Sequence, residues 1–559
     1  MNTTCANCKV NFTILPGDLD FYSQIAPKFA GKSFAIPLPT YCPDCRQQRR
    51  LAFRNERKLY HRTSDFSDQQ ILSVYSADKP HKVYEQDVWW GDAWDPLAYG
   101  KDFDSSRPFF DQFQELLLTV PLMNLSNAHS ENSAYTHNAS RNKDCYLTFC
   151  ASLNEGCLYC YFIQECVDCV DCSYCRKIEL CYECIDCHNC YGLLYSQNSR
   201  TCNNSQYLCN CTGCDHCVGG VNLRNKSYYW LNQQLSSAEY AANLERLSSD
   251  KLFQKETRDA FCELKQQLPH PWSQQQMCED CTGDYLTEST RCNNCFDTNG
   301  SEDCAYSQGL VNCKSCQDVT YFGYPGELLY ECNNIGYDAY NCLFSSYGYG
   351  CQNILYCYNA QFCKNCFGCV SMHHKEYCIL NKQYSEDEYE VLCAQIIEQM
   401  QTTKAWGEFF PVKLSPFCYN ETVALEYFPL TKDEALAQGF TWKESVEEPS
   451  GAARIIEGED LDTPIAEISD EVLSAALRST TSGRLFRIIK SELDFYRKLS
   501  LPLPRLHPDE RYYNRWALRN PRKLWPRPCT KCGETVHTTF ASKRPEQVFC
   551  ETCYHAEVY

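Results

Sequence analysis

The sequence has few methionines and no long apolar run. Of its 559 residues only 5 are methionine, and no stretch approaches the roughly 18 apolar residues that a membrane-spanning helix needs. The first ten residues, MNTTCANCKV, contain neither the basic nor the apolar segment of a secretory signal. These absences predict a soluble, cytoplasmic chain, a compartment in which thiols stay reduced.

Motifs of common catalytic and nucleotide-binding sites are also missing. The chain has no GxxxxGK[ST] phosphate loop, no Rossmann glycine set after a strand, no HExxH and no GxSxG. The formal net charge of −19 at pH 7 disfavours coating of nucleic acid by the whole surface, although it leaves room for local basic patches. No cysteine stands out as a nucleophile, so an enzymatic role stays open while a non-enzymatic one is favoured.

What the sequence does have is 43 cysteines, and the outermost of them form CxxC pairs. Near the C-terminus two such pairs are separated by 17 residues. Each pair can chelate one ion through both sulfurs, and two pairs complete a tetrahedral zinc site. A similar set with a longer intervening loop stands near the N-terminus. The sequence therefore predicts about two Zn²⁺ per chain, held by Cys5, Cys8, Cys42 and Cys45 and by Cys529, Cys532, Cys550 and Cys553.

The N-terminal segment resembles a known family, the probable zinc-ribbon domain. The shared pattern is CxxC, a Phe, an acidic-x-Phe-Tyr segment and a closing Pro-x-x-CPxCR, all within about the first 45 residues. This resemblance implies zinc binding only. Over most of its length the chain also resembles a bacterial family of cysteine-rich, multi-ribbon proteins, through phrases such as YCILNKQYS, AWGEFFP and RNPRKLW. That second resemblance implies a cytosolic bacterial protein and no particular reaction.

Two segments near the N-terminus recur near the C-terminus. LDFY occurs at 19–22 and 493–496, and LAFRNERKLYHR at 51–62 resembles WALRNPRKLWPR at 516–527. Extending this alignment predicts an ancestral unit of two ribbons, duplicated, in which each copy has kept one metal site and lost the other. The eroded ligand positions are Ser479, Ser482, His507 and Glu510 in one copy and Ser64, Ser67, Glu85 and Val88 in the other.

The repeated segments are rich in arginine, with aromatic residues between the arginines. That combination suits phosphate contact with base stacking, so RNA or the ribosome is one candidate partner. The competing interpretation is structural pairing with acids, for instance in the acidic stretch 444–471. The candidate nucleic-acid residues are Arg46, Arg49, Arg50, Arg54, Arg57, Arg515, Arg519, Arg522 and Lys523.

Between the ends, cysteine recurs at every third position, as in CVDCVDCSYC at 166–175. The pattern suggests a repeat of 15 residues with small residues at four inward positions and an aliphatic residue at the fifth. A spacing of three fits neither a helix nor an extended strand and predicts a solenoid of tight coils. Three states of the thiols stay open: reduced core filling, disulfides between coils, and metal ligation.

A second cysteine-rich lobe repeats the first. Residues 211–240 align with 363–389, and both segments end in a capping box that predicts a helix start, at Ser236 and Ser385. His373 and His374 lie among cysteines of the second lobe, so a third metal site is conceivable there. Three tryptophans in DVWWGDAWDP, at 87–96, are expected to pack the degenerate ribbon against a neighbour.

The predicted fold is mainly β, with zinc ribbons at both ends flanking two cysteine-rich β-solenoid lobes, each closed by an α-helix. The function favoured is a zinc-binding, non-enzymatic scaffold, and the alternative is a thiol-based metal-handling or redox protein. The expected parts are 1–62 (ribbon and Arg-rich helix), 63–100 (degenerate ribbon), 101–234 (lobe 1), 235–270 (helical cap), 271–384 (lobe 2), 385–443 (helical cap and connector), 444–475 (acidic linker), 476–528 (degenerate ribbon and Arg-rich helix) and 529–559 (ribbon).

Overall fold

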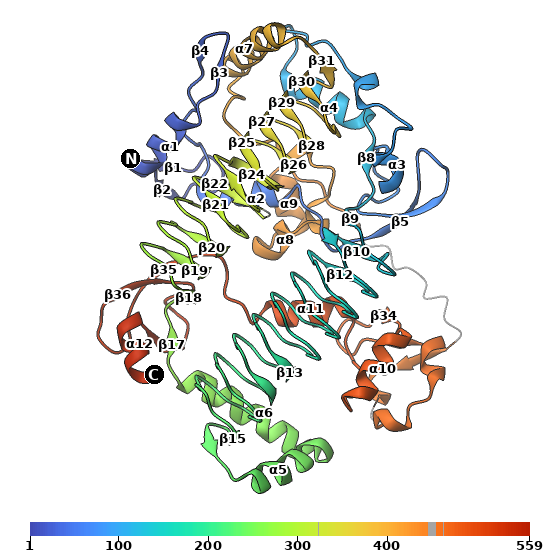
Figure 1. Cartoon of the computed structure of the whole chain (residues 1–559), viewed down its shortest axis with the longest axis vertical. Coiled ribbons are helices and arrows are strands. Elements are labelled where there is room, and N and C mark those ends of the chain that lie inside the picture. The colour runs from blue at the N-terminus through green and yellow to red at the C-terminus, as the bar shows by residue number, and fades with distance from the viewer. Residues whose placement is uncertain (322, 445–453, 462) are drawn as a thin grey trace.

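The computed structural model describes residues 1–321, 323–444, 454–461 and 463–559, and it is mainly β (Figure 1). Over these ranges no helix is long and apolar enough to cross a membrane. The helices are α1 (Pro16–Gln24), α2 (Pro43–Leu51), α3 (Gln86–Trp90), α4 (Phe109–Thr119), α5 (Ser237–Ser249), α6 (Lys251–Gln267), α7 (Glu386–Thr402), α8 (Ala424–Tyr427), α9 (Lys432–Ala437), α10 (Lys490–Lys498), α11 (Pro508–Trp516) and α12 (Glu551–Val558).

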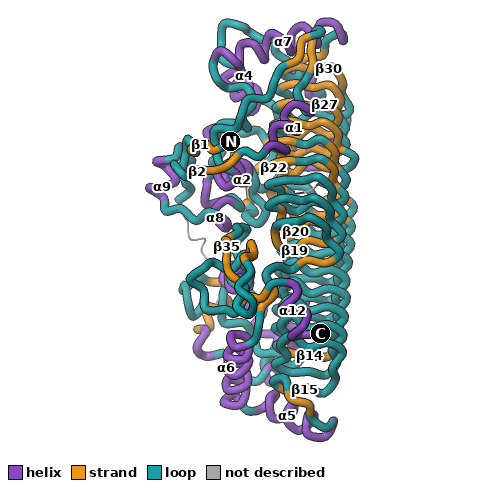
Figure 2. Tube along the Cα trace, turned by 90° about the vertical axis from the view of Figure 1, so that its left-hand side faces the viewer, coloured by secondary structure: helices purple, strands orange, loops and turns teal. Residues whose placement is uncertain are grey.

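Two stacks of parallel coils run along the long axis of the molecule (Figures 1 and 2). Coil stack 1 covers residues 127–230 and is held mostly by single parallel bridges, with short strands at β9 (Asn127–Ala128), β13 (Tyr191–Leu194) and β14 (Asn203–Gln206). Coil stack 2 covers residues 275–379, and its later part is an 11-stranded sheet. The strands of that sheet are β21 (Cys313–Lys314), β22 (Gln317–Thr320), β23 (Gly326–Glu327), β24 (Tyr330–Gly336), β25 (Ala339–Leu343), β26 (Ser346–Tyr349), β27 (Gln352–Leu355), β28 (Tyr358–Gln361), β29 (Lys364–Phe367), β30 (Glu376–Ile379) and β31 (Lys382–Gln383).

The repeat of 15 residues expected from the sequence is wrong, because each coil of stack 1 closes after 12 residues. Val170 pairs with Tyr182, and the amide of Cys172 donates to Cys160 Sγ across a separation of 12 residues. Four triplets of cysteine and two further residues therefore complete one coil. The aliphatic residues that suggested the longer period are inward-facing like the cysteines, and they fall on different sides of successive coils.

Each triplet uses one conformation per position. The first residue faces inward, the second forms the bridge to the next coil, and the third adopts the left-handed region, as at Asp168 (φ 48°), Asp171 (φ 55°) and Tyr174 (φ 55°). A left-handed conformation costs about 1 kcal/mol for a residue with a Cβ. It persists here because the third residue donates to the preceding coil, as Asp168 N does to Glu155 O at 2.9 Å. The left-handed residue makes the corner of the coil.

The cysteine side chains satisfy backbone groups inside the coil. The amide of Cys214 donates to Cys202 Sγ (3.4 Å), and the Cys202 thiol donates to Arg200 O (3.2 Å). Ser205 does the same with its hydroxyl, accepting from Cys217 N at 2.9 Å. Many inward positions thus favour a small side chain that both accepts and donates, which explains why Cys, Ser and Asn recur there, while aliphatic residues such as Ile163 and Ile178 fill others.

Each stack has its last coil at one end of the molecule, and a helix covers each of these two outer ends. A two-residue hairpin, β15 (Tyr229–Trp230) with β16 (Gln233–Gln234), leads from stack 1 into α5, and β30 with β31 leads from stack 2 into α7. The predicted capping boxes at Ser236 and Ser385 are confirmed, since each hydroxyl accepts from the amide three residues on and each Glu side chain reaches back. These caps cover coil edges that would otherwise expose unpaired backbone groups.

The two ends of the chain fold into matching sets of elements, here called the N-terminal unit (residues 1–90) and the C-terminal unit (residues 476–559). Each unit has a hairpin, a helix containing LDFY, a second helix, a later hairpin and a third helix, in that order. The N-terminal unit has one additional hairpin, β3 (Lys28–Phe29) with β4 (Lys32–Ser33), between its first two helices. The hairpins are β1 (Asn2–Thr4) with β2 (Asn11–Thr13), β5 (Tyr60–Thr63) with β6 (Gln70–Ser73), β33 (Ala476–Arg478) with β34 (Leu485–Phe486), and β35 (Trp525–Pro528) with β36 (Thr535–Thr538).

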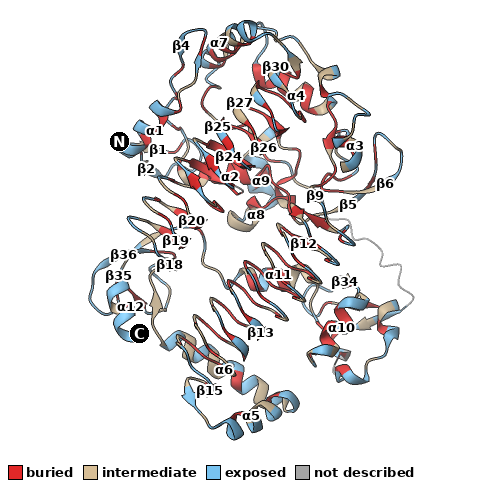
Figure 3. Cartoon of the chain, in the orientation of Figure 1, coloured by how far each residue is buried: buried red, intermediate tan, exposed pale blue. Residues whose placement is uncertain are grey.

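Both units pack on the same side of the coil stacks, and the other side of the stacks carries no helix in Figure 2. The coil interiors are buried over most of their length (Figure 3), except at the start of stack 2, where Cys278 and Cys281 are partly exposed. A separate apolar core, which includes Phe113, Phe344 and Phe410, joins the N-terminal unit, α4 and α7 to the outer face of stack 2. A smaller core joins α10 to the outer face of stack 1 through Tyr182 and Tyr496.

The hydrogen bonds inside the coils predict how single cysteines tolerate change. Cys202→Ala leaves the Cys214 amide without an acceptor, so we expect a loss of about 1–3 kcal/mol in the free energy of unfolding. Cys202→Ser keeps an acceptor and should cost less, while Cys202→Leu should cost most because the coil has no room. Urea denaturation of the variants, with the exposed Cys262 changed to Ala as control, checks this order. Equal effects of Ser and Ala would contradict it.

Candidate metal centres

Four cysteine sulfurs from two loops meet in the N-terminal unit. The Sγ atoms of Cys5, Cys8, Cys42 and Cys45 all lie within 4.8 Å of one another, and Cys8 Sγ is 3.6 Å from Cys42 Sγ. A tetrahedron with Zn–S bonds of about 2.3 Å has sulfurs separated by about 3.8 Å. The geometry of this group fits a four-coordinate zinc ion.

The C-terminal unit holds the equivalent group. Cys529, Cys532, Cys550 and Cys553 have sulfurs within the same 4.8 Å, and Cys532 Sγ is 3.7 Å from Cys550 Sγ. Cys529 follows directly on β35, so the first pair sits on the turn that joins this strand to β36. Over the ranges that the structure describes, three or more His, Cys, Asp or Glu side chains converge closely enough to bind a metal ion at these two groups.

Backbone amides favour the thiolate form of one cysteine in each group. Cys42 and Cys550 each precede a helix, α2 and α12. The neighbouring Cys45 sulfur and then burial raise the pKa of Cys42. The Cys553 amide lowers the pKa of Cys550, but burial and the Cys553 sulfur raise it overall. Burial opposes ionisation of Cys5, but the amides of Cys42 and Cys8 that donate to its sulfur bring the pKa of Cys5 down to about 6. The pKa of Cys529 also falls to about 6, because the amides of Cys532 and Cys550 outweigh the same burial effect.

The eroded positions of the C-terminal unit also come together, around a carboxylate. Glu510 accepts hydrogen bonds from the Ser479 hydroxyl and from the His507 amide, the latter at 2.9 Å. Burial raises the pKa of Glu510, but the hydroxyls of Ser479 and Ser482 outweigh it and lower the pKa overall. The residues at the positions predicted to have lost metal ligands thus form a hydrogen-bonded cluster that contains no sulfur.

The N-terminal unit contains a similar cluster around Glu85. The Ser64 hydroxyl donates to Glu85, and the Ser64 oxygen accepts from the amides of Phe66 (3.1 Å) and Ser67 (3.4 Å). Burial opposes ionisation of Glu85, yet the hydroxyls of Ser64 and Ser67 lower its pKa. Val88, the fourth aligned position, brings no polar group.

The arginines of the N-terminal unit are buried in ion pairs with coil stack 2. Arg46 contacts Asp318 at 2.8 Å, and Arg50 contacts both Asp318 (3.2 Å) and Glu331 (2.8 Å). Arg49 lies between Glu331 and Glu408, at 2.8 and 2.7 Å. In this set the side chains of Arg46 and Arg50 are 2% and 0% exposed, so neither guanidinium group faces solvent.

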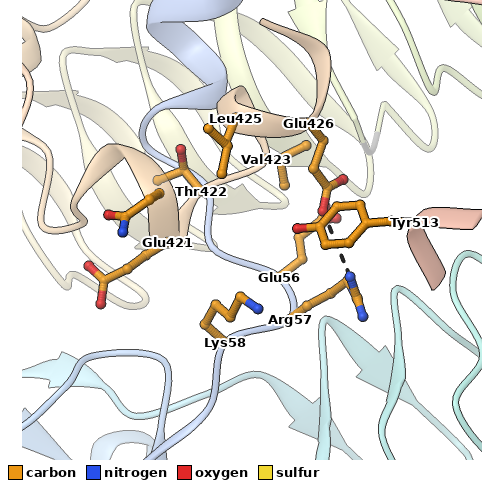
Figure 4. A pocket seen from close by; sticks show the side chains of 10 residues that line it. Glu56, Arg57, Lys58, Glu421, Thr422, Val423, Leu425, Glu426 and Tyr513 are labelled. Atoms are coloured by element: carbon orange, nitrogen blue, oxygen red, sulfur yellow. Dashed lines mark ion pairs between the residues drawn. The ribbon is translucent and has the colours of Figure 1, made fainter. Parts of the chain in front are cut away.

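The arginines that follow are paired too. Arg54 contacts Glu56 and lies over the ring of Tyr321, and Arg57 contacts Asp509 at 3.1 Å. Figure 4 shows Arg57 reaching toward Glu426 beside Tyr513, around a hollow of only about 10 Å³. That hollow is too small for anything beyond a water molecule.

The C-terminal unit repeats these contacts on coil stack 1. Arg511 and Arg515 share Asp171, at 2.5 and 2.8 Å, in the manner of Arg46 and Arg50 with Asp318. Burial alone would lower the pKa of Arg515, but Asp171 and then Glu183 raise it above the ordinary value. Two further arginines of this unit pair with coil carboxylates, Arg519 with Asp186 and Asp297, and Arg522 with Asp297.

The surroundings of these arginines therefore do not support the contact with nucleic acid that the sequence predicted. Carboxylates already occupy the guanidinium groups of Arg46, Arg49, Arg50, Arg54, Arg57, Arg515, Arg519 and Arg522, whose side chains are at most 11% exposed. Lys523 differs, with a side chain that is 54% exposed and 3.6 Å from Asp44. The structural alternative, pairing with acids, is confirmed. Among the described residues the partners of these arginines lie in the coil stacks and in other segments, as Asp318, Asp171 and Glu408 do, and not in the stretch 444–471 that served as an example. Residues 445–453 and 462 lie outside the described residues.

Sequence reasoning missed the carboxylates that receive the arginines. Asp171 lies in the CVDCVDCSYC segment, at the third position of a triplet, and its side chain is 0% exposed. Asp168, three residues earlier, occupies the same position of its own triplet and is 46% exposed. Only the packing of the C-terminal unit separates the two, so the sequence carries no signal that distinguishes them.

A third metal group at His373 and His374 is not formed among the described residues. His373 packs against the rings of Trp89, Trp90 and Trp94, with centroids 5.3–6.0 Å away, and His374 stacks on Phe362 at 5.2 Å. The tryptophans therefore join α3 and the segment that follows it to stack 2. Cysteines of the coils are free thiols in this structure.

Comparison with known proteins leaves the chain without a family. No family model matches it, and no curated protein matches it. One solved structure, from a protein assigned as an acetyltransferase of Desulfovibrio desulfuricans G20, is similar at 12% identity and a TM-score of 0.10. The match covers 41% of this chain and 64% of the other. At that TM-score the likeness says nothing about fold or activity.

The shared carboxylate of stack 1 gives a direct test of the buried ion pairs. Asp171→Asn leaves Arg511 and Arg515 short of a counter-charge in the interior, so we expect a loss of about 3–5 kcal/mol in the free energy of unfolding. Asp168→Asn removes the exposed pair with Lys498 and should change it by less than about 1 kcal/mol. Guanidinium denaturation of both variants measures the contrast. Similar small losses would show that the arginines are not held by charge.

Proposed function

We propose that the chain is a zinc-stabilised, non-enzymatic scaffold that carries one Zn²⁺ in each end unit. The observation that carries the proposal is the convergence of four cysteine sulfurs at each end. Four thiolates suit zinc, which prefers sulfur and a tetrahedral arrangement. A site with four protein ligands leaves no open position for water or substrate, which favours a structural role for the ion over a catalytic one.

In this proposal the coil stacks are two β-solenoid lobes, and the end units are copies of one ancestral pair of zinc ribbons. The matching order of hairpins and helices in the two units supports the duplication. So does the matching way in which Asp318 and Asp171 each receive two arginines. Each ribbon that lost its metal has gained a carboxylate cluster, at Glu85 or Glu510, that replaces the ion as a clasp.

The alternative, metal handling or redox chemistry by the coil cysteines, has less support. Most of these thiols donate to backbone carbonyls, as Cys169 does to Val167 O at 3.2 Å. A metal would have to replace these bonds and draw sulfurs together from separate sides of the coil. Contact with RNA or the ribosome stays a prediction, and the buried arginines do not supply its surface.

Metal content is the test of the proposed function. Purified chain should contain about two zinc ions, Cys8→Ser and Cys532→Ser should each lose one, and the double variant both, because each substitution opens one tetrahedral set. Cys262→Ser, at an exposed cysteine outside both sets, should keep two. Elemental analysis by inductively coupled plasma mass spectrometry gives the count. Many more ions per chain would support metal handling by the coils, and none would contradict both centres.

A further inference from the structure

A pocket of about 310 Å³ lies between coil stack 1 and the C-terminal unit. Its volume is at the lower end of the range for small-molecule sites, about 300–1,000 Å³. One wall comes from the outer face of the first coils and the other from β34, the segment after it and the start of α11. The lining residues are Arg57, Tyr146, Leu147, Phe149, Tyr159, Cys160, Tyr161, Phe486, Arg487, Ile489, His507, Pro508, Asp509 and Tyr512.

Aromatic rings dominate the walls of this pocket. Tyr146 and Tyr159 meet edge to face at 5.7 Å, and Tyr161 meets Tyr512 edge to face at 5.4 Å. Rings in this arrangement present both faces and edges to a bound ligand, and aromatic ligands prefer offset-stacked or edge-to-face contact.

The other half of the molecule shows that the fold does not require aromatic rings at the positions of Tyr161 and Tyr512. Gln47 stands in α2 where Tyr512 stands in α11, and Gln308 precedes Asp318 by as many residues as Tyr161 precedes Asp171. There the two glutamines join the unit to its stack by a direct hydrogen bond of 2.7 Å, Gln47 Nε2 to Gln308 Oε1. The half that keeps zinc at Cys42 therefore uses a polar contact at this place.

Other wall residues differ in the same direction. Counted from the shared carboxylates Asp171 and Asp318, Tyr146 corresponds to Asn293 and Leu147 to Asn294. Leu147 and Asn294 are both left-handed corner residues, with φ of 46° and 53°. Two other aromatic wall residues are common to both halves, since Phe149 corresponds to Phe296 and Tyr159 to Tyr306. The half beside His507 is distinguished by Tyr146, Leu147 and Tyr161, together with Tyr512.

Charged groups at the pocket are already neutralised by the protein. Arg57 contacts Asp509 at 3.1 Å and lies over the Tyr512 ring, with 3.4 Å from the guanidinium carbon to the ring centroid. Burial lowers the pKa of His507 to about 4, so its ring is neutral at pH 7. None of these three groups offers an unpaired charge to a charged ligand. An uncharged ligand loses little hydration free energy when it enters the pocket.

We propose that this pocket is a binding site for a small, uncharged aromatic molecule of one or two rings. The site lies apart from both metal centres and makes no use of zinc. Its specificity comes from the rings of Tyr146, Tyr161 and Tyr512, and its size excludes larger ligands.

Indole is a suitable probe, observed by saturation-transfer difference NMR on the full chain loaded with zinc. We expect saturable binding with a Kd of about 1 mM or tighter. Leu147→Trp places a ring in the pocket and should weaken binding at least about tenfold. Asn294→Trp, the matched change at the corresponding corner of stack 2, should leave the Kd within about twofold.

Thermal melting and zinc content establish that each variant is folded before titration. If Leu147→Trp does not fold, Tyr512→Gln replaces it, because the corresponding position of α2 already holds Gln47. Loss of binding in the pocket variant alone supports the site. Absence of saturation transfer with wild type, unchanged binding in the folded pocket variant, or equal loss in Asn294→Trp would overturn it.

Discussion

Inward-pointing backbone amides set the composition of the coil stacks. An extended strand passes its amides to neighbouring strands, but a coil that turns after every third residue directs some of them into its own interior. Cys172 N donates to Cys160 Sγ, and Cys217 N to Ser205 Oγ. A buried amide without an acceptor costs roughly 1–3 kcal/mol, so these positions select side chains that are small and polar enough to accept. The high cysteine content follows from this requirement.

The outer faces of the same coils determine how the ends of the chain are placed. Acidic residues at left-handed corners meet arginines of the end units, and Asp171 and Asp318 each neutralise two of them. Buried charges contribute stability only when they are paired and hydrogen-bonded, and removal of one partner is expensive. The ends are therefore fixed by many specific contacts, while each group of four cysteines lies within a single end unit.

Several features could be predicted from sequence because they depend on local spacing. The two CxxC sets, the capping boxes at Ser236 and Ser385, and the gathering of eroded positions such as Ser479 and Glu510 each follow from residues at short or alignable separations. The coil length could not be predicted, because inward positions at every third residue fit any multiple of three. The burial of the arginines could not be predicted either. It depends on contacts between distant residues such as Arg515 and Asp171, whose side chains become 3% exposed or less only when the chain folds.

The state of the coil thiols is the central point of this account. Raman spectroscopy of the S–H stretch on the native, zinc-loaded chain measures it without any mutation. We predict a strong S–H band displaced toward the hydrogen-bonded region, because most of the 43 cysteines lie outside the two metal groups and donate to carbonyls. Exchange into D₂O should shift the stretching band of the exposed thiols long before that of the buried thiols. A native spectrum without an S–H band would mean that the coils hold metal thiolates or disulfides, and would contradict the account.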